Sequence, residues 1–132
     1  MQRLLLGTFA MAALLFADGG VQAQEYEPSP GDSVVIYTNK FKPDEFQRAR
    51  EIMVEGFSGA MEASQQTRRT FWMADEKTGE IIGVSFFMKG HSVDEWHDHE
   101  ARQEVLEQLA PLRSAPLVMQ HFTVIGHHKA GQ

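Results

Sequence analysis

Histidines at two places in the chain are the side chains whose types and positions most readily suggest chemistry. His121 lies between Met119 and Thr123 in a segment that alternates like a strand. An imidazole with an ordinary pKa of about 6.5 can act as a base near neutral pH. His97 and His99 lie two positions apart in a predicted helix. We expect His121 to be buried and to be a candidate catalytic base, and we expect His97 on the inner side of its helix as a candidate lining residue of a pocket. The alternatives are a structural role for His121 and plain packing for His97.

The spacing of His97 and His99 argues against a shared metal ion. Side chains at i and i+2 of a helix point about 200° apart, so they do not converge on one ion. The chain has no cysteine, and a zinc site would need carboxylates or His121 brought in from elsewhere. We therefore predict no metal site, place His99 in solvent, and place His127 and His128 on the surface.

One polar and three aromatic side chains complete the candidate site. Asn39, at the end of the first predicted strand, is the candidate polar group of the site, with a turn cap as the alternative. Trp72, Phe87 and Trp96 are candidate walls of a pocket for an apolar or aromatic molecule, with ordinary core packing as the alternative. The sequence contains no Ser/His/Asp set and no glycine-rich phosphate loop that could be assembled into a site.

Hydrophobic periodicity and turn residues predict the elements that must position these side chains. Ser92 followed by Glu95 is a capping box, which opens the second predicted helix. The predicted elements are a strand at 33–41, a helix from Pro43 to about Met61, a hairpin of strands at 67–74 and 80–89, a helix from Val93 to about Ala110, and a strand at 117–127. This β-α-β-β-α-β order predicts a ferredoxin-like α+β fold.

The third predicted strand has two largely apolar faces. Ile82, Val84 and Phe86 lie on one face, and Ile81 and Phe87 lie on the other. Two helices cover only one face of a four-stranded sheet, so the second face would leave an apolar patch larger than monomers usually expose. We therefore predict a homodimer that packs sheet against sheet.

The first 23 residues have the pattern of a secretory signal. Arg3 precedes an uncharged apolar run, and small residues in Val21-Gln22-Ala23 suit cleavage before Gln24. The run is too short to span a bilayer core of ~30 Å, and no second run follows, so we expect no membrane span after the leader is removed. The expected organisation is a signal peptide at 1–23, a flexible lead-in at 24–32, one domain at 33–128 and a tail at 129–132. The mature protein would be periplasmic or secreted.

Length and charge narrow the classes of partner. A chain of 132 residues fits a single domain once a leader is removed. The net charge of −6 at pH 7 argues against a nucleic-acid partner, because such proteins present a basic face. A small molecule and a second copy of the chain are therefore the expected partners.

Two short segments carry a resemblance to a known family. They are Thr38-Asn39 at the end of the first strand and Ser85-Phe86-Phe87-Met88-Lys89 before the second helix. With the element order over residues 33–128, they make the chain similar to the antibiotic biosynthesis monooxygenases, a family of dimeric α+β barrels.

The resemblance implies a cofactor-independent monooxygenase acting on an apolar or aromatic substrate. His121 or His97 would deprotonate the substrate, and Asn39 would hold the oxyanion. A non-catalytic dimer of the same fold, binding a ligand or partner, is the alternative.

The haem-degrading branch of this superfamily does not fit the sequence. Asn39 matches its asparagine, but Phe87 stands where that branch has tryptophan. The segment 105–109 contains no histidine to ligate haem. We therefore expect no haem and no other cofactor.

Overall fold

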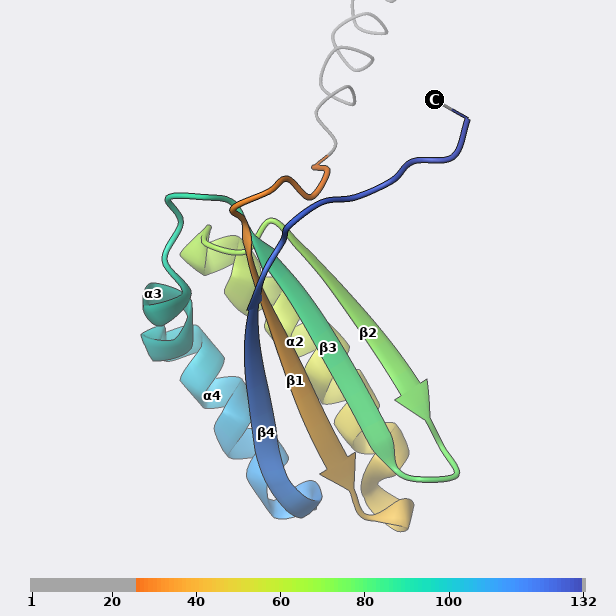
Figure 1. The fold of residues 1–132 in the computed structure, drawn as a ribbon. Helices are drawn as coiled ribbons and strands as arrows, with labels where there is room; N and C mark the ends of the chain where they lie inside the picture. The colour runs from red at the N-terminus through yellow and green to blue at the C-terminus, as the bar shows by residue number, and fades with distance from the viewer. Residues whose placement is uncertain (1–25, 132) are drawn as a thin grey trace, which may run out of the picture.

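The expected α+β fold is confirmed in the computed structural model, which describes residues 26–131 (Figure 1). The expected signal peptide at 1–23 lies outside the described residues. The elements are β1 (Ser33–Phe41), the 3₁₀ helix η1 (Pro43–Glu45), α2 (Phe46–Ser64), β2 (Arg69–Asp75), β3 (Glu80–Phe87), α3 (Val93–Asp98), α4 (Glu100–Leu109), the 3₁₀ helix η2 (Ala110–Leu112) and β4 (Arg113–Thr123).

The four strands form one antiparallel sheet in the order β2-β3-β1-β4. β1 and β3 occupy the centre, and β2 and β4 are the edges (Figure 1). The register pairs Val35 with Ser85 and His121, so these three side chains lie on the same face. This is the strand order that brings both crossover helices to one side.

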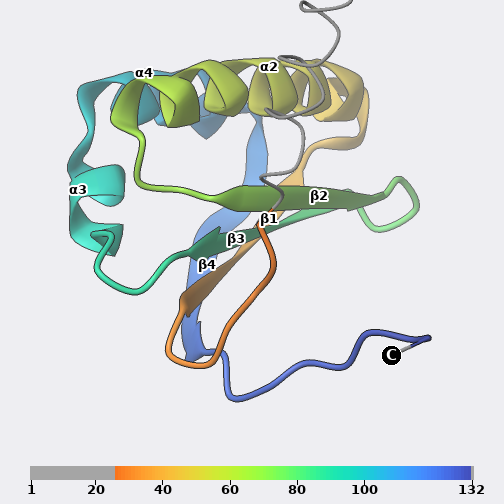
Figure 2. The same cartoon turned by 90° about the horizontal axis from the view of Figure 1, so that it is seen from above.

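The helices cover the face that carries the odd-numbered residues of β1 and β3. Val35, Phe41, Ile81 and Phe87 are all at most 2% exposed on this helix-covered face. Figure 2 shows α2 and α4 on one side of the sheet, while the carboxyl-terminal tail runs on the other side. We call the uncovered side the open face; its apolar side chains are Val34, Ile36, Phe71, Met73, Ile82, Val84, Phe86, Val118 and Phe122.

Two helices approach each other closely where the chain has a glycine. A Cβ atom on Gly56 of α2 would lie 2.9 Å from Cγ2 of Val105 in α4. The neighbouring Gly59 has nothing within 4 Å of such an atom. Gly56 therefore sets the distance between the two helices that cover the sheet, whereas Gly59 has no packing role.

The second predicted helix is in fact two helices, which corrects the expectation of a single helix from Val93 to Ala110. His99 has an extended backbone (ψ 133°) between α3 and α4, and its Nδ1 accepts a hydrogen bond from the Ala101 N–H at 3.1 Å. Nη1 of Arg102 donates to the His97 carbonyl at 3.0 Å. These side chains satisfy backbone groups that a continuous helix would pair internally.

The last strand also begins and ends earlier than expected. β4 covers Arg113–Thr123 rather than 117–127, so Pro116 lies inside the strand and does not close the preceding loop. The pairing of β4 with β1 shifts register between Thr38 and Lys40, opposite this proline. An edge strand with a bulge accommodates proline because no ladder hydrogen bond is required of it there.

The segment before β1 makes defined contacts from Tyr26 onward. Asp32, 4% exposed, accepts hydrogen bonds from the Tyr26 hydroxyl at 2.6 Å and from the backbone N–H groups of Ser29 and Lys89. The Tyr26 ring lies 6.2 Å from that of Phe86 on the open face. Within residues 26–131, no helix is long and apolar enough to cross a membrane.

Candidate active site

A cavity lies between the helix layer and the sheet, lined by side chains from α2, α3, α4 and all four strands. Its volume is about 30 Å³, which is room for little more than one or two water molecules. A ligand of one or two rings must therefore displace flexible wall side chains, and methionine is well suited to such movement. The lining residues are Tyr37, Asn39, Met53, Phe57, Met61, Thr70, Trp72, Gly83, Ser85, Trp96, Arg102, Leu106 and Leu117.

Tyr37 lines this cavity and is hydrogen-bonded to His97, which does not itself line it. The Tyr37 hydroxyl is 2.8 Å from Nε2 of His97, and it donates to that nitrogen when the imidazole carries its proton on Nδ1. Burial, assisted by the charge of Arg102 and by His121, lowers the pKa of His97 to about 4. Burial also raises the pKa of Tyr37 to about 12. Both members of the pair are therefore neutral near pH 7.

Asn39 lies in the cavity wall, held by the two neighbouring strands. Its side chain is 4% exposed, its Oδ1 accepts from Nη2 of Arg113 at 3.1 Å, and its Nδ2 donates to the Ile81 carbonyl at 3.4 Å. The bond to Arg113 fixes the amide with its nitrogen directed away from that guanidinium. Because the bond to Ile81 is long, the amide N–H group remains available to a ligand oxygen.

Arg102 is the buried charge of the site. It is 5% exposed, and its guanidinium carbon lies 5.8 Å from the centre of the Tyr37 ring and 5.7 Å from that of Trp96. These are cation–π distances. Burial lowers the pKa of Arg102, but an arginine side chain stays charged at neutral pH. The site therefore combines apolar walls with a positive charge.

The remaining predicted site residues lie in different places. Trp72 and Trp96 line the cavity, whereas Phe87 is fully buried in the core beside Val35 and does not line it. His121, expected to be buried, is exposed in the protomer because β4 is an edge strand, although its ring lies 5.9 Å from that of His97.

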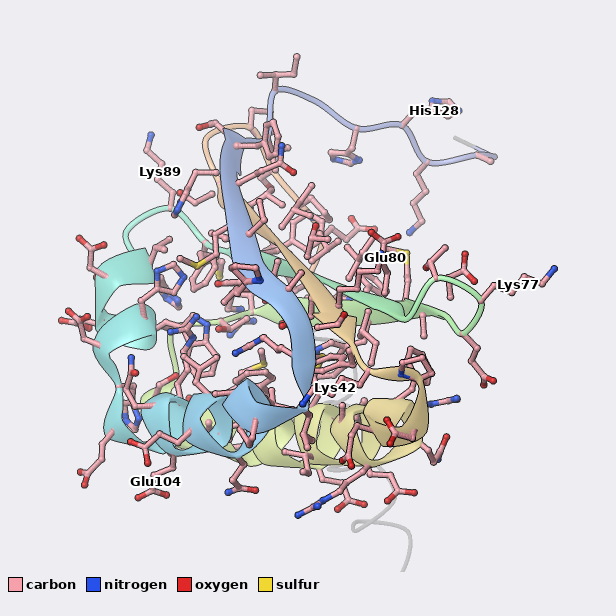
Figure 3. The ribbon with its side chains drawn as sticks, turned by 90° about the horizontal axis from the view of Figure 1, so that it is seen from below. Lys42, Lys77, Glu80, Lys89, Glu104 and His128 are labelled. Carbon is pink, nitrogen blue, oxygen red and sulfur yellow. The ribbon has the colours of Figure 1, made fainter. Side chains whose placement is uncertain are left out.

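The other histidines do not join the site. His99, expected in solvent, is half-buried as the cap of α4, where its Nδ1 already accepts a hydrogen bond. His127 and His128 are exposed, and His128 projects from the tail in Figure 3. Within residues 26–131, no three histidine or carboxylate side chains are grouped to hold a metal ion.

Sequence reasoning missed two central residues, Tyr37 and Arg102. Tyr37 has the same strand parity as Val35 and Asn39, so alternation alone would have placed it on the covered face. Arg102, Val105 and Leu109 follow the three-then-four spacing of an apolar helix stripe. A charged residue within that stripe was the available signal.

Comparisons with known proteins match this chain at the level of fold. No family model matches the sequence, and no curated protein matches it. A protein provisionally named an antibiotic biosynthesis monooxygenase from Caulobacter crescentus is 11% identical over 74% of this chain and 92% of its own, with a TM-score of 0.62. Another, from Chloroflexus aurantiacus, is 18% identical over 76% and 99%, with a TM-score of 0.58.

A third structure with the same provisional name, from Nitrosomonas europaea, is 9% identical over 75% of this chain and 95% of its own, with a TM-score of 0.60. At these identities the likeness concerns the fold alone. The chain therefore has the ferredoxin-like α+β fold of structures named as antibiotic biosynthesis monooxygenases, as the sequence resemblance predicted.

Proposed function

We propose that this protein is an exported homodimer that binds a small, largely apolar or aromatic molecule in the cavity between helices and sheet. The observation that carries the proposal is the cavity itself, which places two tryptophans beside the polar groups of Asn39, Tyr37 and Arg102. Apolar walls with a few placed polar groups are typical of small-molecule sites. Export rests on the signal pattern of residues 1–23.

The open face supports the homodimer. Phe71, Met73, Val118 and Phe122 are 47%, 52%, 53% and 50% exposed in the protomer. They extend an apolar surface across the whole sheet, and a second copy of the same face is the simplest cover. We expect the protein to sediment at twice its protomer mass, and Val84→Lys in central β3 to shift it toward monomer and destabilise it. A stable wild-type monomer at high concentration would refute the proposed dimer.

Catalysis by cofactor-independent oxygenation is the second candidate function, and the hydrogen bond that joins Tyr37 of the cavity wall to His97 behind it favours it. In such a reaction an activated CH₂ group loses a proton, its carbanion reduces O₂, and the peroxide loses water. The balance is CH₂ + O₂ → C=O + H₂O. The neutral His97 would accept the proton through Tyr37, and Asn39 would hold the oxyanion.

The lowered pKa of His97 sets a limit on this chemistry. An imidazole that protonates only near pH 4 is a weak base at neutral pH, so it suits substrates whose carbon acid is already strongly activated. A suitable probe is 1,3-indandione, whose CH₂ group lies between two carbonyls. We expect oxygen uptake and formation of the triketone, both reduced in Tyr37→Phe. Binding without oxygen uptake would support the non-catalytic alternative.

A pair of glycine variants tests the binding proposal. A Cβ on Gly83, in the cavity wall, would lie 3.5 Å from Cδ1 of Trp72 and 3.7 Å from Cδ2 of Tyr37, which is ordinary contact. Gly83→Ala should therefore fold normally while reducing the cavity. Gly59→Ala, on the exposed side of α2, is the matched control because nothing lies within 4 Å.

The measurement is calorimetric titration with nitrobenzene, a single-ring apolar probe. We expect the wild type and Gly59→Ala to bind it equally and Gly83→Ala to bind it several-fold more weakly. Equal binding by all three proteins would show that the ligand sits outside the cavity.

A further inference from the structure

The edge strand β2 lacks the features that usually block further strand pairing. Its seven residues keep one unbroken register with β3, and the segment 70–74 includes no proline and no charged side chain. Phe71 and Met73 are exposed along it. The other edge strand, β4, contains Pro116 and shifts its register with β1. Because proline and irregular pairing protect an edge, β2 is the edge that remains a template for another strand.

The helix layer leaves room for an added strand beside β2, which is the outermost strand on its side of the sheet in Figure 1. Two hollows of about 340 and 460 Å³ lie between β2 and α2, and Trp72 borders both of them. The α2 residues that line these hollows run from Arg50 to Gln65, which is about 22 Å at the helical rise per residue. The seven residues of β2 span a similar length. Space therefore extends along the free edge of β2.

The sequence of β2 is complementary to a second copy of itself. Two copies that run antiparallel about a two-fold axis at Trp72 place Arg69 of one opposite Asp75 of the other. The same register places Phe71 opposite Met73. Each of these pairs occurs twice because of the symmetry. Opposite charges that face each other across antiparallel strands are stabilising, and methionine sulfur makes favourable contacts with aromatic rings.

Neighbouring registers lose this complementarity. With the axis at Phe71, Arg69 faces Met73. With the axis at Met73, Asp75 faces Phe71. A register displaced by a single residue sets the open face of one copy beside the helix-covered face of the other. Of these registers, only the one with its axis at Trp72 pairs charge with charge and apolar with apolar, and it keeps both kinds of pair on the open-face side.

We propose that β2 is a self-association surface at which two copies of this chain pair antiparallel about Trp72, joining their four-stranded sheets into one continuous sheet. This surface consists of strand edges, so it is separate from the open face and does not depend on the cavity or its ligand. One strand pair buries less area than two packed sheets, and interfaces of small area are weak. We therefore expect it to join open-face dimers as the protein concentration rises.

Charge variants test the pairing by sedimentation equilibrium over a range of protein concentrations at low salt. The weight-average mass of the wild type should rise from that of the open-face dimer toward twice that value. Asp75→Lys brings like charges together at both ends of the strand pair and should hold the mass at that of the dimer. The double variant Arg69→Asp, Asp75→Lys exchanges the charges and should restore the rise. Glu104→Lys makes the same charge change at an exposed position of α4 (Figure 3) and should behave as the wild type.

Cysteine cross-linking tests the register, because the chain has no cysteine of its own. In the proposed pairing, Thr70 of one copy faces Ala74 of the other, whereas the two Thr70 residues are about 14 Å apart along the strands. A disulfide needs Cα atoms within about 7 Å of each other. An oxidised mixture of Thr70→Cys and Ala74→Cys should therefore give disulfide-linked pairs, and each variant alone should not. This test leaves Asp75 intact, whose carboxylate also accepts from the Lys77 N–H in the hairpin turn.

Three results would overturn the inference. A wild-type mass that is independent of concentration would show that β2 stays unpaired. Cross-linking of either cysteine variant alone as fast as of the mixture would exclude the register centred on Trp72. Protection of β2 amides from hydrogen exchange by a peptide of unrelated sequence, without a rise in the mass of the protein alone, would show that the edge serves another partner. A mass that rises from one protomer to two in the wild type, but not in Asp75→Lys, would support β2 pairing and refute the open-face dimer instead.

Discussion

The close approach of α2 and α4 at Gly56 gives a stability prediction with a built-in control. Gly56→Ala and Gly59→Ala each replace a helical glycine by alanine, which contributes about 1 kcal/mol of helix propensity. In Gly56→Ala, the new methyl group would lie 2.9 Å and 3.1 Å from the two Cγ atoms of Val105, and these are part of a stiff branched side chain. Overpacking of this kind costs about 1–3 kcal/mol.

The two variants should therefore differ in unfolding free energy by about 1–3 kcal/mol, the cost of the overlap, because the propensity gain cancels. Urea unfolding at a fixed protomer concentration measures this difference as a change in midpoint at constant slope. In a Val105→Ala background the overlap disappears, so Gly56→Ala should there become as stabilising as Gly59→Ala. Equal stabilisation by both alanines in the wild-type background would refute the close approach of the helices.

Three further variants test other features. His97→Gln should flatten the rise of unfolding free energy with pH between about pH 4 and 6.5, because burial depresses the folded-state pKa of His97 and the unfolded chain binds the extra proton in that window. Ser92→Ala should destabilise the protein by about 1 kcal/mol, measured by urea unfolding, through loss of the Ser92 Oγ bond to the Glu95 N–H. Asp32→Asn should increase the rate of proteolysis of the segment before β1 at neutral pH. The Tyr26 hydroxyl lowers the pKa of Asp32, so the carboxylate is ionised and accepts hydrogen bonds that hold this segment, and the amide of asparagine is a weaker acceptor.

The fold was largely predictable because its signals are local and mutually consistent. The strand predicted at 33–41 has the same bounds as β1 in the structure, and Pro43 begins the first helical turn, as predicted. The Ser92 cap also forms as expected. What local pattern could not indicate was the break at His99, since no proline or glycine marks it. At the break, the His99 ring accepts from the Ala101 N–H and Arg102 donates to the His97 carbonyl, and neither side-chain bond is marked by a residue type that usually ends a helix.

The candidate site was less predictable, because the tertiary fold decides which polar side chains are buried in the cavity wall and which are exposed. Asn39, Trp72 and Trp96 line the cavity, but His121 lies on an edge strand whose position follows from sheet order rather than from its own sequence pattern. Tyr37 has the sequence pattern of an ordinary strand aromatic, and only the fold brings its hydroxyl to His97. Pairing across sixty positions of sequence is not visible in either segment alone.

The most direct measurement of a ligand site in the cavity uses the two tryptophans, which are the only ones in the chain and both line it. Each gives one indole N–H signal in a ¹⁵N correlation spectrum, and Trp72→Phe assigns them. Titration with nitrobenzene should shift both signals saturably, with the same affinity as in calorimetry. Both indole signals remaining fixed, while backbone amides of the open face move, would contradict a ligand site between helices and sheet.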